Sequence, residues 1–157
     1  MRAIRSMFSA LTAIGVALLA APAGSAPVIE GTYYEDNTSA SCGGSSVCDA
    51  VFTLIRKGTH LLVTHVSCHA EVNWAGSYPG VLSNAKLMRM RAGDIDFVRE
   101  EILARSAEAV NNVNYYRIGG PTSFLYRSGD RPFVRLQSVT SNYYLKCRIT
   151  GQLQTPL

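Results

Sequence analysis

The stretch YYLKCRITGQL, residues 143–153, decides the fold because it alternates like a half-buried β-strand. Every second residue belongs to an apolar face, and the residues between them are mostly polar or charged. The apolar face consists of Tyr143, Leu145, Cys147, Ile149, Gly151 and Leu153, and the opposite face of Tyr144, Lys146, Arg148, Thr150 and Gln152. The pattern predicts a strand that directs Cys147 into a core.

A second stretch, THLLVTHVSCHAEVNW at residues 59–74, also predicts a strand. It is rich in β-branched residues and has no helix start signal. The expected inner face consists of Leu62, Val66, Cys68, Ala70 and Val72, and the expected outer face of His65, Ser67, His69 and Glu71. Cys68 is therefore expected to point into the same core as Cys147.

The three histidines of the chain, His60, His65 and His69, all lie in this stretch. At a rise of about 3.3 Å per residue, His65 and His69 are roughly 13 Å apart on a straight strand and cannot ligate one ion together. His69 and Glu71 are about 7 Å apart and are close enough to share a ligand. We therefore expect no metal site and no cofactor.

Most of the remaining chain consists of short β-rich segments between turn signals such as Gly119-Gly120-Pro121. The expected strands are 28–34, 47–55, 61–72, 83–91, a segment from 95, 113–118, 123–127, 133–139 and 143–153. Eight or nine strands at this spacing predict an all-β protein, an antiparallel, jelly-roll-like β-sandwich. Residues 99–109 are good helix formers, so a short helix around 95–110 is the alternative there.

The N-terminus has the pattern of a secretory signal peptide. Arg2 and Arg5 precede an apolar run, and residues 21–23 (APA) form a cleavage signature. The run is shorter than the roughly 20 residues that span a bilayer. We expect a signal peptide at residues 1–23, with cleavage as late as residue 25, and one domain at 24–157 without a transmembrane span. The expected location is the periplasm or the extracellular space.

The four cysteines fit an exported chain with two disulfides. Cys42 and Cys48 enclose five small or flexible residues, so we expect them to pair with each other. Cys68 and Cys147 both face inward in the predicted strands, so we expect the second bridge there. A zinc site built from Cys42, Cys48, Cys68 and His69 would match no familiar zinc spacing.

Charge and motifs exclude several functions. The chain has 15 Lys and Arg against 11 Asp and Glu, and residues 1–23 hold two of the arginines, which leaves 13 against 11. This near balance does not predict a nucleic-acid partner. Neither a G-x-S-x-G elbow nor a phosphate-binding G-x-x-x-x-G-K loop occurs. We therefore do not assign an enzymatic activity, and no oligomeric state is indicated.

Aromatic residues form the candidate binding site. Tyrosines occur in three adjacent pairs, 33–34, 115–116 and 143–144, and neighbours on a strand face opposite sides. Each pair should bury one ring and expose the other. The candidate binding residues are Tyr34, Tyr116 and Tyr144, with Trp74 and Tyr78 on a loop, and Tyr33 and Tyr115 as alternatives to their neighbours. The expected partner is a protein or a glycan.

Residues 57–67 (KGTHLLVTHVS) resemble a "GK-x-LVI-x-x-VS" strand motif of small exported bacterial proteins of unknown function. Residues 123–129 (SFLYRSG) are similar to the "VRLYADPG"-like segment of that group, and 150–153 (TGQL) stand where it ends in a "GYL"-like strand. The resemblance covers about residues 47–153 and implies a β-sandwich without a known activity. The cysteines and residues 99–109 depart from it, so disulfides and middle strands are not implied.

Together these features predict an exported, disulfide-stabilised, non-catalytic binding protein of the cell envelope or extracellular space. The alternative is a small secreted hydrolase that uses polar residues near His65, His69 and Glu71.

Overall fold

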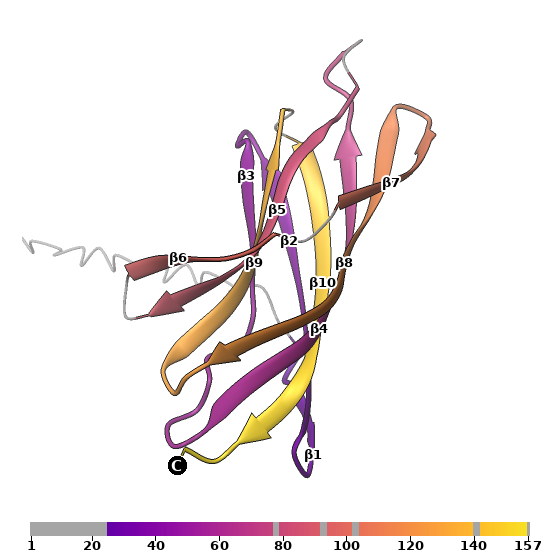
Figure 1. Ribbon diagram of the computed structural model, residues 1–157. Coiled ribbons are helices and arrows are strands. Elements are labelled where there is room, and N and C mark those ends of the chain that lie inside the picture. The colour runs from indigo at the N-terminus through magenta and orange to yellow at the C-terminus, as the bar shows by residue number, and fades with distance from the viewer. Residues whose placement is uncertain (1–24, 77–78, 92–93, 102–103, 140–141, 157) are drawn as a thin grey trace, which may run out of the picture.

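Two antiparallel β-sheets make up the fold (Figure 1). The computed structural model describes residues 25–76, 79–91, 94–101, 104–139 and 142–156. The strands are β1 Val28–Glu30, β2 Tyr33–Gly43, β3 Val47–Val51, β4 His60–Asn73, β5 Leu82–Arg91, β6 Asp94–Glu101, β7 Ala104–Val110, β8 Val113–Tyr126, β9 Asp130–Ser138 and β10 Asn142–Gln154. The six-stranded sheet has the order β1-β2-β10-β4-β8-β7, and the four-stranded sheet has the order β3-β9-β5-β6.

The all-β prediction is confirmed, and the sandwich-like arrangement agrees with it. Nine strands have five or more residues, which matches the expected eight or nine, and the three-residue β1 is additional. The described residues between 94 and 110 form β6 and β7, so the strand and not the alternative helix is found there.

One hydrophobic core lies between the two sheets and receives side chains from both. The alternation of β10 is reproduced, since Tyr143, Leu145, Cys147 and Ile149 are all buried. Leu87, Val134 and Leu136 of the four-stranded sheet belong to the same cluster and have no exposed surface. Burial of these faces supplies the main driving force for the fold.

β4 departs from the predicted alternation at a β-bulge. Thr150 of β10 pairs with His65, but Gly151 pairs with Val63, so Thr64 is an extra residue in β4. A bulge of one residue exchanges the faces on its two sides. The placement of Leu62 on the inner face is therefore wrong: Leu61 and Val63 are fully buried and Leu62 is only partly buried.

β8 runs without interruption through Gly119-Gly120-Pro121, so the predicted turn at these residues is wrong. Both glycines have positive φ, +131° and +155°, within the strand. A Cβ on Gly119 would overlap the carbonyl group of Val66 on β4, so β8 approaches β4 more closely there than any other residue type would allow. The predicted strands 113–118 and 123–127 are thus one continuous strand.

The structure contains two disulfides, as predicted from the cysteine count. Cys68 and Cys147 are paired residues on the inner faces of β4 and β10, with their Cα atoms 4.1 Å apart. Cys42 and Cys48 join β2 of the six-stranded sheet to β3 of the four-stranded sheet. Two disulfides indicate an oxidising, extracytoplasmic environment.

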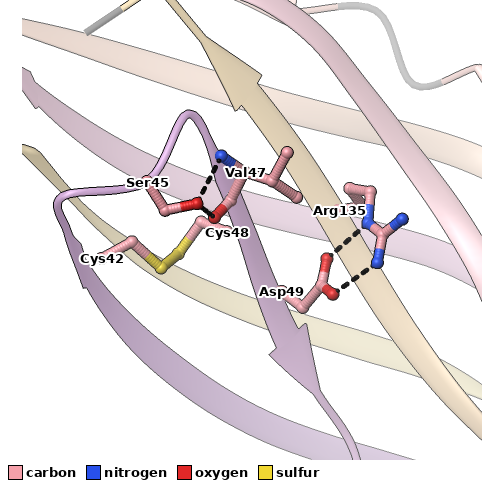
Figure 2. A network of polar contacts seen from close by, with 6 residues as sticks. All are labelled: Cys42, Ser45, Val47, Cys48, Asp49 and Arg135. Atoms are coloured by element: carbon pink, nitrogen blue, oxygen red, sulfur yellow. Dashed lines mark hydrogen bonds and ion pairs between the residues drawn. A yellow bond between two sulfur atoms is a disulfide. The ribbon is translucent and has the colours of Figure 1, made fainter. Parts of the chain in front are cut away.

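Figure 2 shows an ion pair close to the Cys42–Cys48 disulfide. Arg135 of β9 donates two hydrogen bonds to Asp49 of β3, from Nε to Oδ1 at 2.8 Å and from Nη2 to Oδ2 at 2.7 Å. This bidentate ion pair holds the outer strand β3 in register with β9.

In the part of the chain that the structure describes, no helix has the length and apolar character needed to cross a membrane. The predicted signal peptide at residues 1–23 lies outside the described residues.

Candidate functional site

A shallow hollow of about 750 Å³ opens on the outer face of the six-stranded sheet. We call it the groove. It is lined by Asn37 of β2 and by residues 65–69 of β4, 117–121 of β8 and 146–148 of β10. Its volume lies within the range of about 300–1,000 Å³ that is usual for ligand sites.

The groove exists because small residues lie in the middle of the sheet and long ones surround them. Arg148, Ser67 and Gly119 are neighbours in one row across β10, β4 and β8, and Asn37 of β2 continues the row. Ser67 has a short side chain and Gly119 has none, so these two form the floor. The missing side chain at Gly119 therefore also helps to create the hollow.

Three permanent cations define the charge of the groove. Lys146, His69 and Arg117 form the next row across β10, β4 and β8, and all three are exposed. Lys146 and Arg117 are two strands apart, about 10 Å at the usual strand spacing, and Arg148 is about 7 Å from Lys146 along β10. Lys146 and Arg117 have no ion-pair partner among the residues whose side chains the structure describes.

Side chains of β2 bind Arg148 at one edge of the groove. Its Nε donates to Oδ1 of Asn37 at 3.0 Å and lies 3.4 Å from Oε1 of Glu35. Hydrogen bonds from Tyr33 and Asn37 and the charge of Arg148 lower the pKa of the Glu35 carboxyl. Glu35 thus remains an anion at this end, where it partly neutralises Arg148.

The three residues of the predicted hydrolase site lie on the same face of the sheet, but only two of them are in contact with each other. His65, His69 and Glu71 all point outward from β4. His69 Nε2 lies 3.8 Å from Glu71 Oε1, with both side chains nearly half exposed. Nothing in the described part of the chain gathers three or more His, Cys, Asp or Glu side chains into a metal-binding group.

An aromatic row borders the groove on the side opposite Glu35. Tyr144, Glu71 and Tyr115 are neighbours across β10, β4 and β8. The ring of Tyr115 stacks on His69, with centroids 5.9 Å apart and an angle of 29° between the planes. Tyr144 is 39% exposed. Two tyrosines therefore flank the Glu71 carboxylate next to the basic row.

Each tyrosine pair buries one ring and directs the other outward, as expected, but in two pairs the buried ring is the one predicted to bind. Tyr34 and Tyr116 are buried, at 3% and 7% exposure, and belong to the core. Trp74 is partly buried, and its Nε1 donates to Oδ1 of Asn114 at 3.3 Å. Tyr144 is exposed beside the groove, and Tyr78 lies outside the described residues.

Hydrogen bonds allow Tyr34 and Tyr116 to point inward, because each buried hydroxyl group has an acceptor. The Tyr34 hydroxyl donates to Oδ2 of the buried Asp36 at 3.2 Å, and burial together with this carboxylate raises the pKa of the phenol. The Tyr116 hydroxyl donates to the Gly80 carbonyl at 3.0 Å. A buried tyrosine needs such a partner; Asp36 lies two residues away on the same strand, and Gly80 lies in a distant segment.

Sequence reasoning missed the basic residues as a site. Lys146 and Arg148 were placed on the outer face of the last strand, but Arg117 was not linked to them. The signal that could have found them is the alternation of β4, β8 and β10, combined with the order in which these strands pair. That order depends on contacts between distant segments.

No family model, no curated protein and no solved structure matches the chain. What the groove can bind follows from its own residues.

Proposed function

We propose that this chain is an exported, non-catalytic binding protein that holds an anionic ligand in the groove. The observation that carries the proposal is the placement of Arg117, Lys146 and Arg148 around a floor of Ser67 and Gly119. Two of these cations are without ion-pair partners among the described side chains, so they are available to a ligand. Arg and Lys donate charge-assisted hydrogen bonds to carboxylate, sulfate or phosphate oxygens.

The proposed location is the periplasm or the extracellular space. The disulfides support an oxidising compartment, and the residues at the start of the chain have the composition of a cleavable signal peptide. In such a location the groove meets free anions and the charged polymers of cell surfaces.

The hydrolase alternative has less support. All four cysteines are bridged, and no hydrogen bond joins His65 or His69 to a serine or threonine hydroxyl in the described residues. A nucleophile activated by an imidazole would need such a contact. The His69–Glu71 pair instead forms one wall of a binding surface.

Calorimetric titration with citrate and with tripolyphosphate at low ionic strength tests the proposal. Both anions should bind wild-type protein, with an affinity that falls as salt is added. The double variant Arg117→Gln/Lys146→Gln should bind roughly tenfold more weakly, because it loses two exposed charge contacts. Arg127→Gln/Arg131→Gln, which also removes two exposed cations but outside the groove, is the matched control and should bind normally.

Two results would overturn the anion-binding function. One is that neither anion binds the folded wild-type protein. The other is that Arg127→Gln/Arg131→Gln weakens binding as much as Arg117→Gln/Lys146→Gln does, which would mean that only the net charge of the chain matters.

A further inference from the structure

The basic rows and the aromatic row form one continuous surface on the six-stranded sheet. Passing along β10 from Arg148 to Lys146 to Tyr144, each residue points outward in the next row. Tyr144 and Tyr115 lie on either side of Glu71, about 10 Å apart at the usual strand spacing. A ligand that reaches both rows therefore meets cations at one end and two aromatic rings at the other.

Glu71 makes the aromatic row unsuitable for a purely anionic ligand. Its side chain is 44% exposed, and its carboxylate accepts but cannot donate hydrogen bonds. It would repel a phosphate or sulfate above it, whereas it would accept hydrogen bonds from hydroxyl groups. The surface thus offers donors for anions in the rows of Lys146 and Arg148 and an acceptor for hydroxyls one row away.

A nucleic acid fits this surface poorly. A nucleic-acid backbone carries a negative charge at every nucleotide, so a strand that lies along the groove needs cations throughout its path. Here the two basic rows lie between the carboxylates of Glu35 and Glu71, which are one row beyond them on each side. A charged backbone running along β10 would pass over both.

We infer that the ligand of the groove is an acidic oligosaccharide, in which sugars that carry a carboxylate alternate with neutral, hydroxyl-bearing sugars. This inference rests on the proposed anion-binding function and specifies its ligand class. The carboxylates bind Arg117, Lys146 and Arg148, the hydroxyls donate to Glu71, and the apolar face of one sugar ring packs on Tyr144.

Titration with a hyaluronan tetrasaccharide, in which a uronate alternates with a neutral sugar, tests the inference, with citrate, a neutral cello-oligosaccharide of equal length and a single-stranded oligonucleotide as the other probes. The hyaluronan tetrasaccharide should bind about tenfold more tightly than citrate, because it adds contacts in the aromatic row to those with the cations. Tyr144→Ala should weaken binding of the tetrasaccharide by roughly three- to tenfold. Leu125→Ala, which removes a similarly exposed apolar side chain of β8 outside the groove, should leave it unchanged.

The outcomes separate the two proposals. If citrate binds but the hyaluronan tetrasaccharide binds no more tightly, the glycan inference is overturned and the anion-binding function stands. Tighter binding of the oligonucleotide, or equal binding of the neutral oligosaccharide, also overturns the inference. If none of the anionic probes binds, the proposed function itself fails.

Discussion

Replacing Gly119 by alanine should strongly destabilise the protein, and replacing its neighbour Gly120 should do so much less. Both residues have positive φ in β8, +131° and +155°, so alanine at either position is strained. They differ in what the added methyl group meets. At Gly120 no atom lies within 4 Å, but at Gly119 the carbonyl carbon of Val66 lies 2.8 Å away and the Val66 oxygen is closer still.

The expected size of each effect follows from this geometry. A non-glycine residue in this region of φ costs about 1–3 kcal/mol, which should be the whole loss of unfolding free energy in Gly120→Ala. In Gly119→Ala the methyl carbon must also move out to an ordinary contact distance of about 3.5 Å. That movement separates β8 from β4 and loses one or two ladder hydrogen bonds at about 1 kcal/mol each. We therefore expect a loss of about 3–5 kcal/mol for Gly119→Ala.

Urea unfolding followed by circular dichroism at neutral pH measures both losses. The difference between the two variants isolates the contact with Val66, because both carry the backbone strain. Equal losses would mean that the close approach of β8 to β4 does not require glycine. A Gly119→Ala protein as stable as the wild type would refute the continuous path of β8 through this position.

Two further predictions concern stability. Removing the Cys68–Cys147 bridge by a double alanine substitution should lower the free energy of unfolding more than removing Cys42–Cys48 does. The chain-entropy model gives losses of about 4.5 and 2.2 kcal/mol, because the sequence separations are 79 and 6. Urea unfolding under oxidising conditions measures both losses, and equal losses would contradict the prediction. Burial and the charge of Asp49 raise the pKa of Tyr143 to about 12, above an unfolded value of about 10. The stability that neutral Tyr143 contributes should be complete below pH 10 and should decline from about pH 10 to 12. Urea unfolding at a series of pH values should show a smaller decline for Tyr143→Phe than for the wild type. An equal decline in both proteins would contradict the assignment to Tyr143.

The faces of β10 were predictable because its alternation is unbroken. In β4 the same reasoning succeeded from His65 onward and failed at Leu62. The extra residue, Thr64, reverses the alternation, and nothing in its local sequence marks a bulge. The glycines at 119 and 120 look like a turn because glycine serves both turns and close strand contacts, and only the neighbouring strand decides between them.

The candidate site was harder to predict than the fold. Periodicity places Lys146 and His69 on outer faces, but it does not say that the two residues are neighbours, since their pairing joins segments 77 positions apart in the sequence. The tyrosine pairs have the same difficulty. Residues 35–41 of β2 are polar or small, so local alternation does not show whether Tyr33 or Tyr34 lies on the face that meets the core.

The position of β10 in the six-stranded sheet has a consequence for how the chain folds. β10 is the last described strand in chain order, yet it lies between β2 and β4 and pairs with both. Until it is present, these two early strands share no neighbour, and their backbone groups on that side stay unpaired. Such non-local pairing makes folding slow and leaves strand edges open to aggregation meanwhile. The centre of the sheet can therefore close only after its last strand has left the ribosome.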